Sequence, residues 1–421
     1  MSTHQRARRP RDLRLDFFRG LAMFIIFIAH VPHNPWKAWI PAAFGPSDAT
    51  ELFVFCSGMA SAMAFGSLFR DRSFFLGTAR TAYRVWQVYW AHVCLFAVMV
   101  TMIAIFDQMH GDDFYSTRLY TRPIFDDTAR HLIGFMTLQY VPNYFDILPM
   151  YMVILMMMPV VMALSRISRW AVFAFIGGVW FLTQFDILQL GAEVREGNDR
   201  EWFFNPFGWQ IIFFLGFSFV MGWIKPPPRS WWLVLAAAVI VGLGVLTASR
   251  YGWGNFDWVI PFRRANRWLF WKTDLGIFRI VHFLAVCYLA WFVVGEGGKR
   301  LAMSGIPGRI VDVIRKVGQQ SLAVFVSGMV LSQFMGAALD QTAERGPVAL
   351  AWANLTGCAI LIGIAYLVGW YKSEPWRREV VVPAKRVAEP RAEPRSEARG
   401  GEATSAEVRT LEPRTKGRAA V

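Results

Sequence analysis

Three ionisable side chains interrupt an apolar stretch near the start of the chain, LDFFRGLAMFIIFIAH. Arg19 and His30 are eleven residues apart, close to three helical turns, so a helix would place them on one face about 16 Å apart. Asp16 lies one turn before Arg19 and can pair with it. Ionisable groups within a membrane are costly and usually functional, and histidine is well suited to moving protons near neutral pH.

This arrangement suits a substrate with an anionic head and an extended arm. Coenzyme A has both, because its phosphates can bind an arginine and its pantetheine arm ends in a thioester. We therefore predict that Arg19 and Asp16 bind an acyl donor and that His30 acts at the acyl group. The alternative is structural: Asp16 and Arg19 form an interfacial ion pair, and His30 only caps the helix.

The next apolar stretch begins with acidic residues, in SDATELFVFCSG. Asp48 and Glu51 have the spacing of a helix capping box, and we interpret Asp48 as the cap. Glu51 heads an apolar run, and it could orient the His30 imidazole as a carboxylate does in a catalytic triad. Capping alone is the alternative for Glu51. His33 is a competing base, for which a surface position is the simpler interpretation.

Other candidates could bind an acyl carboxylate or the acceptor. Arg279 and His282 lie one turn apart in a later apolar stretch, where packing is the alternative role. Tryptophan and arginine alternate through residues 253–272, which predicts either a sugar-binding platform or an amphipathic helix on anionic lipid. The acceptor contacts selected from this segment and from NYFDILP are Arg267, Trp268, Trp271, Asn143 and Tyr144.

These residues require helices that cross a membrane. The chain is 55% hydrophobic and only 18% charged, and long apolar runs recur to residue 371, so we predict an all-α, polytopic integral membrane protein. The predicted spans are 13–31, 48–67, 82–106, 146–165, 169–186, 207–224, 231–249, 276–295, 318–338 and 349–371. Lysine and arginine are more frequent in the loops that would be cytoplasmic if both termini were inside. Residues 129–140 are too short to span and predict a re-entrant or interfacial helix, and 296–317 is assigned to a cytoplasmic loop.

The predicted domains are a basic cytoplasmic tail (1–12), a membrane domain (13–371) and a disordered cytoplasmic tail (372–421) rich in Arg, Glu, Ala and Pro. The net charge of +14 is attributed to cytoplasmic loops and not to a nucleic-acid partner. No His, Cys, Asp or Glu cluster has ligand spacing, so neither a metal site nor a permanently bound cofactor is expected.

Several of these motifs resemble one family. Arginine, ten residues and histidine in the first span, followed by ELFVFCSG, resemble the signatures of the type 3 membrane acyltransferase superfamily, with Glu51 where aspartate is commoner. More specifically, six blocks between Leu13 and Tyr371 resemble the OpgC family. They are LRLDFFRGLAMFIIFIAHVPHNP, SDATELFVFCSG, LQYVPNYFDILPMY, NPFGWQIIFFLGF, KTDLGIFRIVHFLAV and GQQSLAVFVSG.

The resemblance implies ten spans in a bacterial inner membrane and transfer of succinyl groups from cytoplasmic succinyl-CoA, the co-substrate, to periplasmic glucans. His30 would act as general base or as acyl carrier. Two rivals stay open. One is an O-acetyltransferase acting on another cell-envelope glycan. The other is a glycan or anion transporter that performs no covalent chemistry, against which the lack of a visible internal repeat counts.

Overall fold

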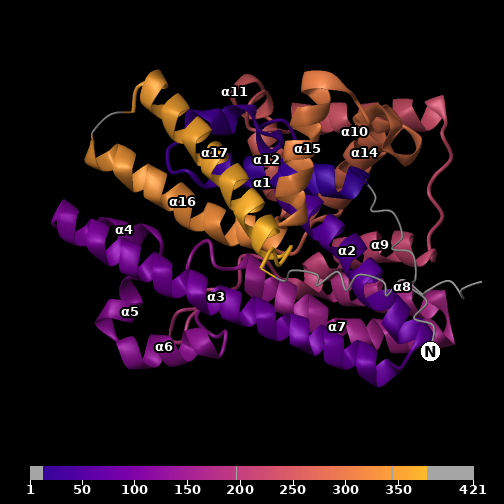
Figure 1. Ribbon diagram of the computed structural model, residues 1–421, viewed down its shortest axis with the longest axis horizontal. Coiled ribbons are helices and arrows are strands. Elements are labelled where there is room, and N and C mark those ends of the chain that lie inside the picture. Colours follow the sequence, from indigo (N-terminus) through magenta and orange to yellow (C-terminus); the bar gives the residue numbers. More distant parts are fainter. Residues whose placement is uncertain (1–12, 196, 343–344, 377–421) are drawn as a thin grey trace, which may run out of the picture. The chain divides into compact units, whose positions relative to one another are not determined.

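Apolar residues recur at helical spacing along the chain, and the computed structural model accordingly folds into helices (Figure 1). It describes residues 13–195, 197–342 and 345–376, and within these ranges it holds one isolated bridge, Gly191 to Glu201, and no strand. The all-α prediction is confirmed for this part. Contacts divide the chain after Glu374, and the helices of the described ranges belong to the unit that ends there. The expectations for 1–12 and for 377–421 lie outside the described residues.

Each of the ten predicted spans coincides with a helix. These are α1 (Leu13–His30), α2 (Ala49–Asp71), α3 (Phe74–His110), α7 (Ile147–Ile167), α8 (Arg169–Thr183), α9 (Pro206–Met221), α10 (Trp231–Leu246), α14 (Ile277–Val294), α16 (Ser321–Gln341) and α17 (Pro347–Tyr371). In the described ranges, six of them are long and apolar enough to cross a membrane: α2, α3, α7, α14, α16 and α17. Helices α8, α9 and α10 are apolar but shorter, and α1 carries three charged residues. Several apolar helices thus indicate a multi-pass membrane protein, while the number of spans and their orientation stay predictions.

Shorter helices occupy the connections. They are η1 (Pro35–Trp39), η2 (Pro41–Ala43), α4 (Phe114–Arg118), α5 (Arg122–Asp126), α6 (Thr128–Met136), α11 (Gly252–Asn255), α12 (Val259–Ala265), α13 (Arg267–Phe270), η3 (Glu296–Leu301) and α15 (Gly305–Gln319). Helix α6 largely coincides with the expected short helix at 129–140. Most of α15 falls in the segment assigned to a loop. This helix was not predicted, because its apolar face is narrow and charged residues such as Arg309 and Asp312 interrupt the apolar pattern. Val311 and Val317 are buried on that face.

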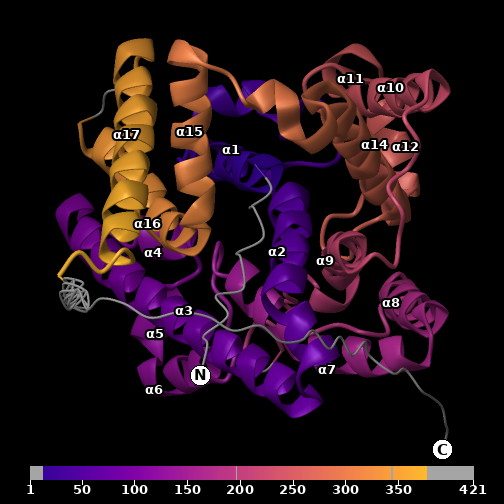
Figure 2. The ribbon, with the colours of Figure 1, turned by 45° about the vertical axis from the view of Figure 1, so that its right-hand side comes forward.

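Helix α1 packs among elements from both ends of the chain. It contacts α2, α15, α16 and α17, and Figures 1 and 2 show the three C-terminal helices gathered beside it. Its buried residues include Ala22, Met23, Ile26 and Phe27, which recur at helical spacing on one face. The C-terminal helices therefore fix the helix that carries Arg19 and His30.

The contact between α1 and α15 depends on two glycines. A Cβ atom at Gly20 would overlap the Ile314 carbonyl, and one at Gly318 would overlap the Asp16 carbonyl. Small residues that let backbones approach closely are the usual basis of helix packing in membranes. This approach brings the junction of α15 and α16 against the first turns of α1.

We predict that Gly20→Ala lowers the thermal unfolding midpoint of the detergent-solubilised protein. The added methyl group meets backbone that cannot move aside, and overpacking of this kind costs about 1–3 kcal/mol. Gly363→Ala in α17 is the matched control, because a Cβ there meets nothing within 4 Å. That variant should keep or raise the midpoint, since alanine favours helix more than glycine does. Equal shifts in the two variants would contradict the role assigned to Gly20.

Candidate active site

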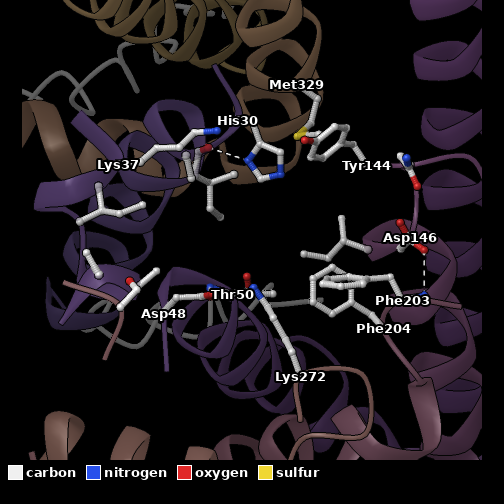
Figure 3. Close-up of a pocket in the computed structure, with 18 of the residues that line it drawn as sticks. His30, Lys37, Asp48, Thr50, Tyr144, Asp146, Phe203, Phe204, Lys272 and Met329 are labelled. Atoms are coloured by element: carbon white, nitrogen blue, oxygen red, sulfur yellow. Dashed lines mark hydrogen bonds and ion pairs between the residues drawn. The ribbon is translucent and has the colours of Figure 1, made fainter. Parts of the chain in front are cut away.

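His30 ends α1, and its imidazole is held by the helix itself. Nδ1 lies 2.7 Å from the carbonyl oxygen of Ile26, four residues earlier. A carbonyl can only accept, so Nδ1 carries the proton and donates it. Nε2 is left as the ring nitrogen that faces the cavity (Figure 3). The neutral ring therefore offers a lone pair to whatever occupies that cavity, as a general base or nucleophile requires.

The cavity beside His30 has a volume of about 880 Å³ and is built from segments far apart in the sequence. Helices α1 and α16 contribute one wall, with Ile26, Phe325 and Met329. Its charged lining residues are Lys37, Asp48, Asp146, Arg250 and Lys272. A volume of this size accommodates a sugar ring or an acyl chain, within the range of small-molecule sites in proteins.

An acidic pair, Asp48 and Glu51, lies at the start of α2, and Asp48 lines the floor of the cavity. Asp48 accepts from the Thr50 N–H at 2.7 Å, and its backbone N–H donates to Glu51 Oε2 at 2.8 Å, which confirms the predicted capping box. Lys272 Nζ lies 2.5 Å from Asp48 Oδ2. Burial alone would raise the pKa of Asp48, but the charges of Lys272 and Arg279 outweigh it and hold that pKa well below its ordinary value.

Glu51 has partners other than the expected His30. Its side chain is fully buried, and Oε1 accepts two hydrogen bonds from Arg279, one of them from Nε at 2.9 Å. The imidazole is oriented by Ile26 instead, so the triad-like contact predicted from the sequence is not what holds the ring. The physical reason is that a buried carboxylate requires a cation, and Arg279 approaches it from α14.

The same ion pair engages Arg279, for which binding of an acyl carboxylate, binding of the acceptor and packing were the alternatives. Its guanidinium is buried against Glu51, with Asp48 Oδ2 at 3.9 Å. His282 is also buried, and its Nδ1 lies 2.6 Å from Ser47 Oγ. Neither residue lines the cavity, and Arg279 lies behind Asp48 of its floor.

Arg19 lies at the junction of α15 and α16. It donates to the Gly318 carbonyl at 3.3 Å and to Ser321 Oγ at 3.0 Å, and no ion pair joins it to Asp16 in the part of the chain that the structure describes. Asp16 Oδ2 is buried and finds no hydrogen-bond partner among the described residues. The cavity beside His30 does not extend to Arg19.

The expected acceptor residues fall into two groups. Asn143 and Tyr144 line the cavity, and the Tyr144 ring meets the His30 ring edge-on, with centroids 5.2 Å apart. Arg267, Trp268 and Trp271 lie around α13, away from the cavity, where Arg267 stacks on the Trp271 ring at 3.9 Å. Both tryptophans are exposed. His33 is exposed as well and is not part of the cavity lining.

Sequence reasoning missed several cavity residues. Asp146, just before α7, was not among the candidate residues, but it is buried, accepts from the Phe203 N–H at 3.1 Å and lines the cavity. Burial raises its pKa to about 6. Lys37 belongs to no motif, and Lys272 falls in the tryptophan- and arginine-rich segment. No local pattern could have joined them to His30, because residues far apart in the sequence meet only in the fold.

No group of residues able to hold a metal ion occurs within the described ranges.

The chain matches a known family over most of its length. A family model described as OpgC protein matches residues 11–373, which include all of the cavity. No curated protein and no solved structure matches the chain.

The Glu51–Arg279 pair yields a prediction about stability. Arg279→Gln leaves a buried carboxylate without its cation and should cost about 3–5 kcal/mol. Adding Glu51→Gln should recover much of this loss, because the remaining amides are both neutral. Unfolding midpoints of the two single variants and the double variant would measure the coupling. A double variant as unstable as the sum of the single ones would show that the two residues do not depend on each other.

Asp146 yields a prediction about pH. Its pKa is higher in the folded protein, about 6 against an ordinary 3.8, so its stabilising contribution is complete at low pH and is lost as the pH rises through about 6. Asp146→Asn should therefore raise the unfolding free energy at pH 7.5, by up to about 3 kcal/mol, and flatten its change between about pH 4 and 7. A variant that is less stable than the parent at pH 7.5 would contradict this.

Proposed function

The chain belongs to the OpgC family, and on that premise we propose that it transfers a succinyl group from cytoplasmic succinyl-CoA to hydroxyl groups of periplasmic glucans. Family membership points to an acyltransferase that modifies glucans. The observation that supports this activity best is the state of His30, whose Nδ1 is committed to the helix while Nε2 faces a cavity of substrate size.

His30 is the proposed catalytic residue, and it can act in two ways. As a general base, Nε2 accepts the proton of a sugar hydroxyl while that oxygen attacks the thioester carbonyl. The coenzyme A thiolate then leaves and takes up a proton. As an acyl carrier, Nε2 itself attacks the thioester, the thiolate leaves, and the sugar hydroxyl attacks the acyl-imidazole in a second step. In both cases the Ile26 carbonyl stabilises the imidazole when its positive charge develops.

Arg19 is the proposed anchor for the phosphates of the donor, with Asp16 in the same turn. Helical geometry puts about 16 Å between Arg19 and His30, a span for the extended pantetheine arm. The contacts to Gly318 and Ser321 aim the guanidinium at the α15–α16 junction. With the N-terminus in the cytoplasm, this junction faces the inside and His30 faces the periplasm. Glu51 supports the floor of the site through Arg279.

Asn143 and Tyr144 are the proposed contacts for the acceptor sugar, because they line the cavity beside His30. Arg267, Trp268 and Trp271 would form a second, outer surface, where the exposed indoles can stack on sugar rings and the guanidinium suits an anionic glucan. We place the protein in a bacterial inner membrane as a multi-pass enzyme, with the bilayer as its third partner and no permanently bound cofactor.

Two rival functions share the same residues. An O-acetyltransferase would use His30 identically and differ only in how the acyl chain is recognised. A transporter would use the buried charges as a path and leave its substrate chemically unchanged. The fixed tautomer of His30 favours the enzyme, because a reactive lone pair held at a cavity serves proton or acyl transfer.

We predict that His30→Ala abolishes label transfer from radiolabelled succinyl-CoA to neutral periplasmic glucan in membranes carrying the protein. Loss of a general base typically reduces the rate about 10²–10⁴-fold, and loss of an acyl carrier removes the pathway. The assay measures label in the anionic glucan fraction.

His33→Ala is the matched control, since this neighbouring histidine is exposed and outside the cavity, and it should retain transfer. Succinyl transfer that persists in His30→Ala would refute the role of His30 as the catalytic residue. A parent protein inactive with both succinyl-CoA and acetyl-CoA would move the assignment to transport.

A further inference from the structure

Lys37 brings a positive charge to the cavity beside His30. It belongs to η1, it is half-buried, and it lines the cavity together with His30. In the part of the chain that the structure describes, no carboxylate forms an ion pair with it. Burial and the nearby charge of Arg118 lower its pKa, since both oppose a positive charge there. An anion in the cavity would relieve this cost.

The segment that carries Lys37 is held firmly. Asn34 caps η1 by accepting from the Trp36 N–H, and its carbonyl accepts from the Lys37 N–H at 3.1 Å. Asn34 is itself buried and donates to Asn354 of α17 at 2.8 Å and to the Ile28 carbonyl at 3.1 Å. The backbone of Lys37 is therefore fixed relative to the end of α1, and Figure 3 shows its side chain on the same side of the cavity as His30.

The other cations of the cavity are engaged. Lys272 is paired with Asp48, across the cavity from Lys37. Arg250 is exposed and stacks on the Trp39 ring at 4.2 Å. Among the described residues that line the cavity, Lys37 is thus the half-buried cation whose charge is not neutralised by a paired carboxylate.

We propose that Lys37 binds the free carboxylate of the acyl group and thereby selects dicarboxylic acyl donors over monocarboxylic ones. This rests on the proposed function, because it assumes that the acyl carbonyl lies at His30. A succinyl group carries its carboxylate two methylenes beyond the reacting carbonyl, so a cation beside His30 can reach it. Butyryl has the same four-carbon length and no charge, and acetyl has neither, so neither gains from Lys37.

The test compares succinyl-CoA with butyryl-CoA as donors to a neutral glucan, in membranes carrying the parent protein or Lys37→Gln. We expect Lys37→Gln to lower kcat/KM for succinyl transfer about 10- to 100-fold and to leave butyryl transfer unchanged, as loss of a hydrogen bond between charged groups would. Retained butyryl transfer also shows that the variant is folded. Lys37→Arg should preserve most of the succinyl preference.

Arg250→Gln is the control that distinguishes a direct contact between Lys37 and the acyl carboxylate from an effect of the overall positive charge of the cavity. An equal loss of succinyl preference in Arg250→Gln would overturn the assignment to Lys37, as would an unchanged preference in Lys37→Gln or an equal fall for both donors. Binding of the two donors to the purified protein without glucan separates this proposal from the function. A Lys37-dependent preference for succinyl-CoA in binding, without any transfer, would support the carboxylate site and refute the acyltransferase.

Discussion

The candidate site depends on the fully buried carboxylate of Glu51. A carboxylate removed from water must be compensated, and Arg279 of α14 supplies the charge while the Asp48 N–H supplies a hydrogen bond. That requirement joins the start of α2 to α14. Asp48 is paired with Lys272, so the floor of the cavity and the Glu51–Arg279 pair behind it form a network of two carboxylates and two cations whose formal charges cancel. With the floor neutral, the electrostatic character of the cavity is decided by its remaining walls.

Much of the fold could be predicted from the sequence because it depends on long apolar runs. All ten predicted spans coincide with helices, with ends differing by a few residues except at α3, which starts eight residues earlier than expected. The position of His30 at the end of a helix and the capping box of Asp48 were predictable as well, because both follow from spacing within one segment. The number of spans does not follow in the same way, because α8, α9 and α10 are shorter than the helices long enough to cross a membrane.

The partners of the site residues could not be predicted in this way. Glu51 was considered as a partner of His30 because the two residues lie at neighbouring helix ends. That neighbourhood does not determine whether the carboxylate binds the His30 imidazole or another buried group such as the Arg279 guanidinium. Arg279 is separated from it by more than two hundred residues, and only packing brings them together. The same holds for Lys37 and Asp146, whose positions in the connections between long helices conceal that both face one cavity.

The hydrogen bond from His30 to Ile26 has a consequence for how the site can change. In a catalytic triad the imidazole is oriented by another side chain, and one substitution removes the orienting group. Here the acceptor is a main-chain carbonyl, which every residue at position 26 would present while the helix persists. The helix backbone therefore fixes the tautomer of His30, whichever residue occupies position 26. Substitutions in the residues that line the cavity can change which substrates enter, while Nε2 of His30 keeps its lone pair toward the cavity.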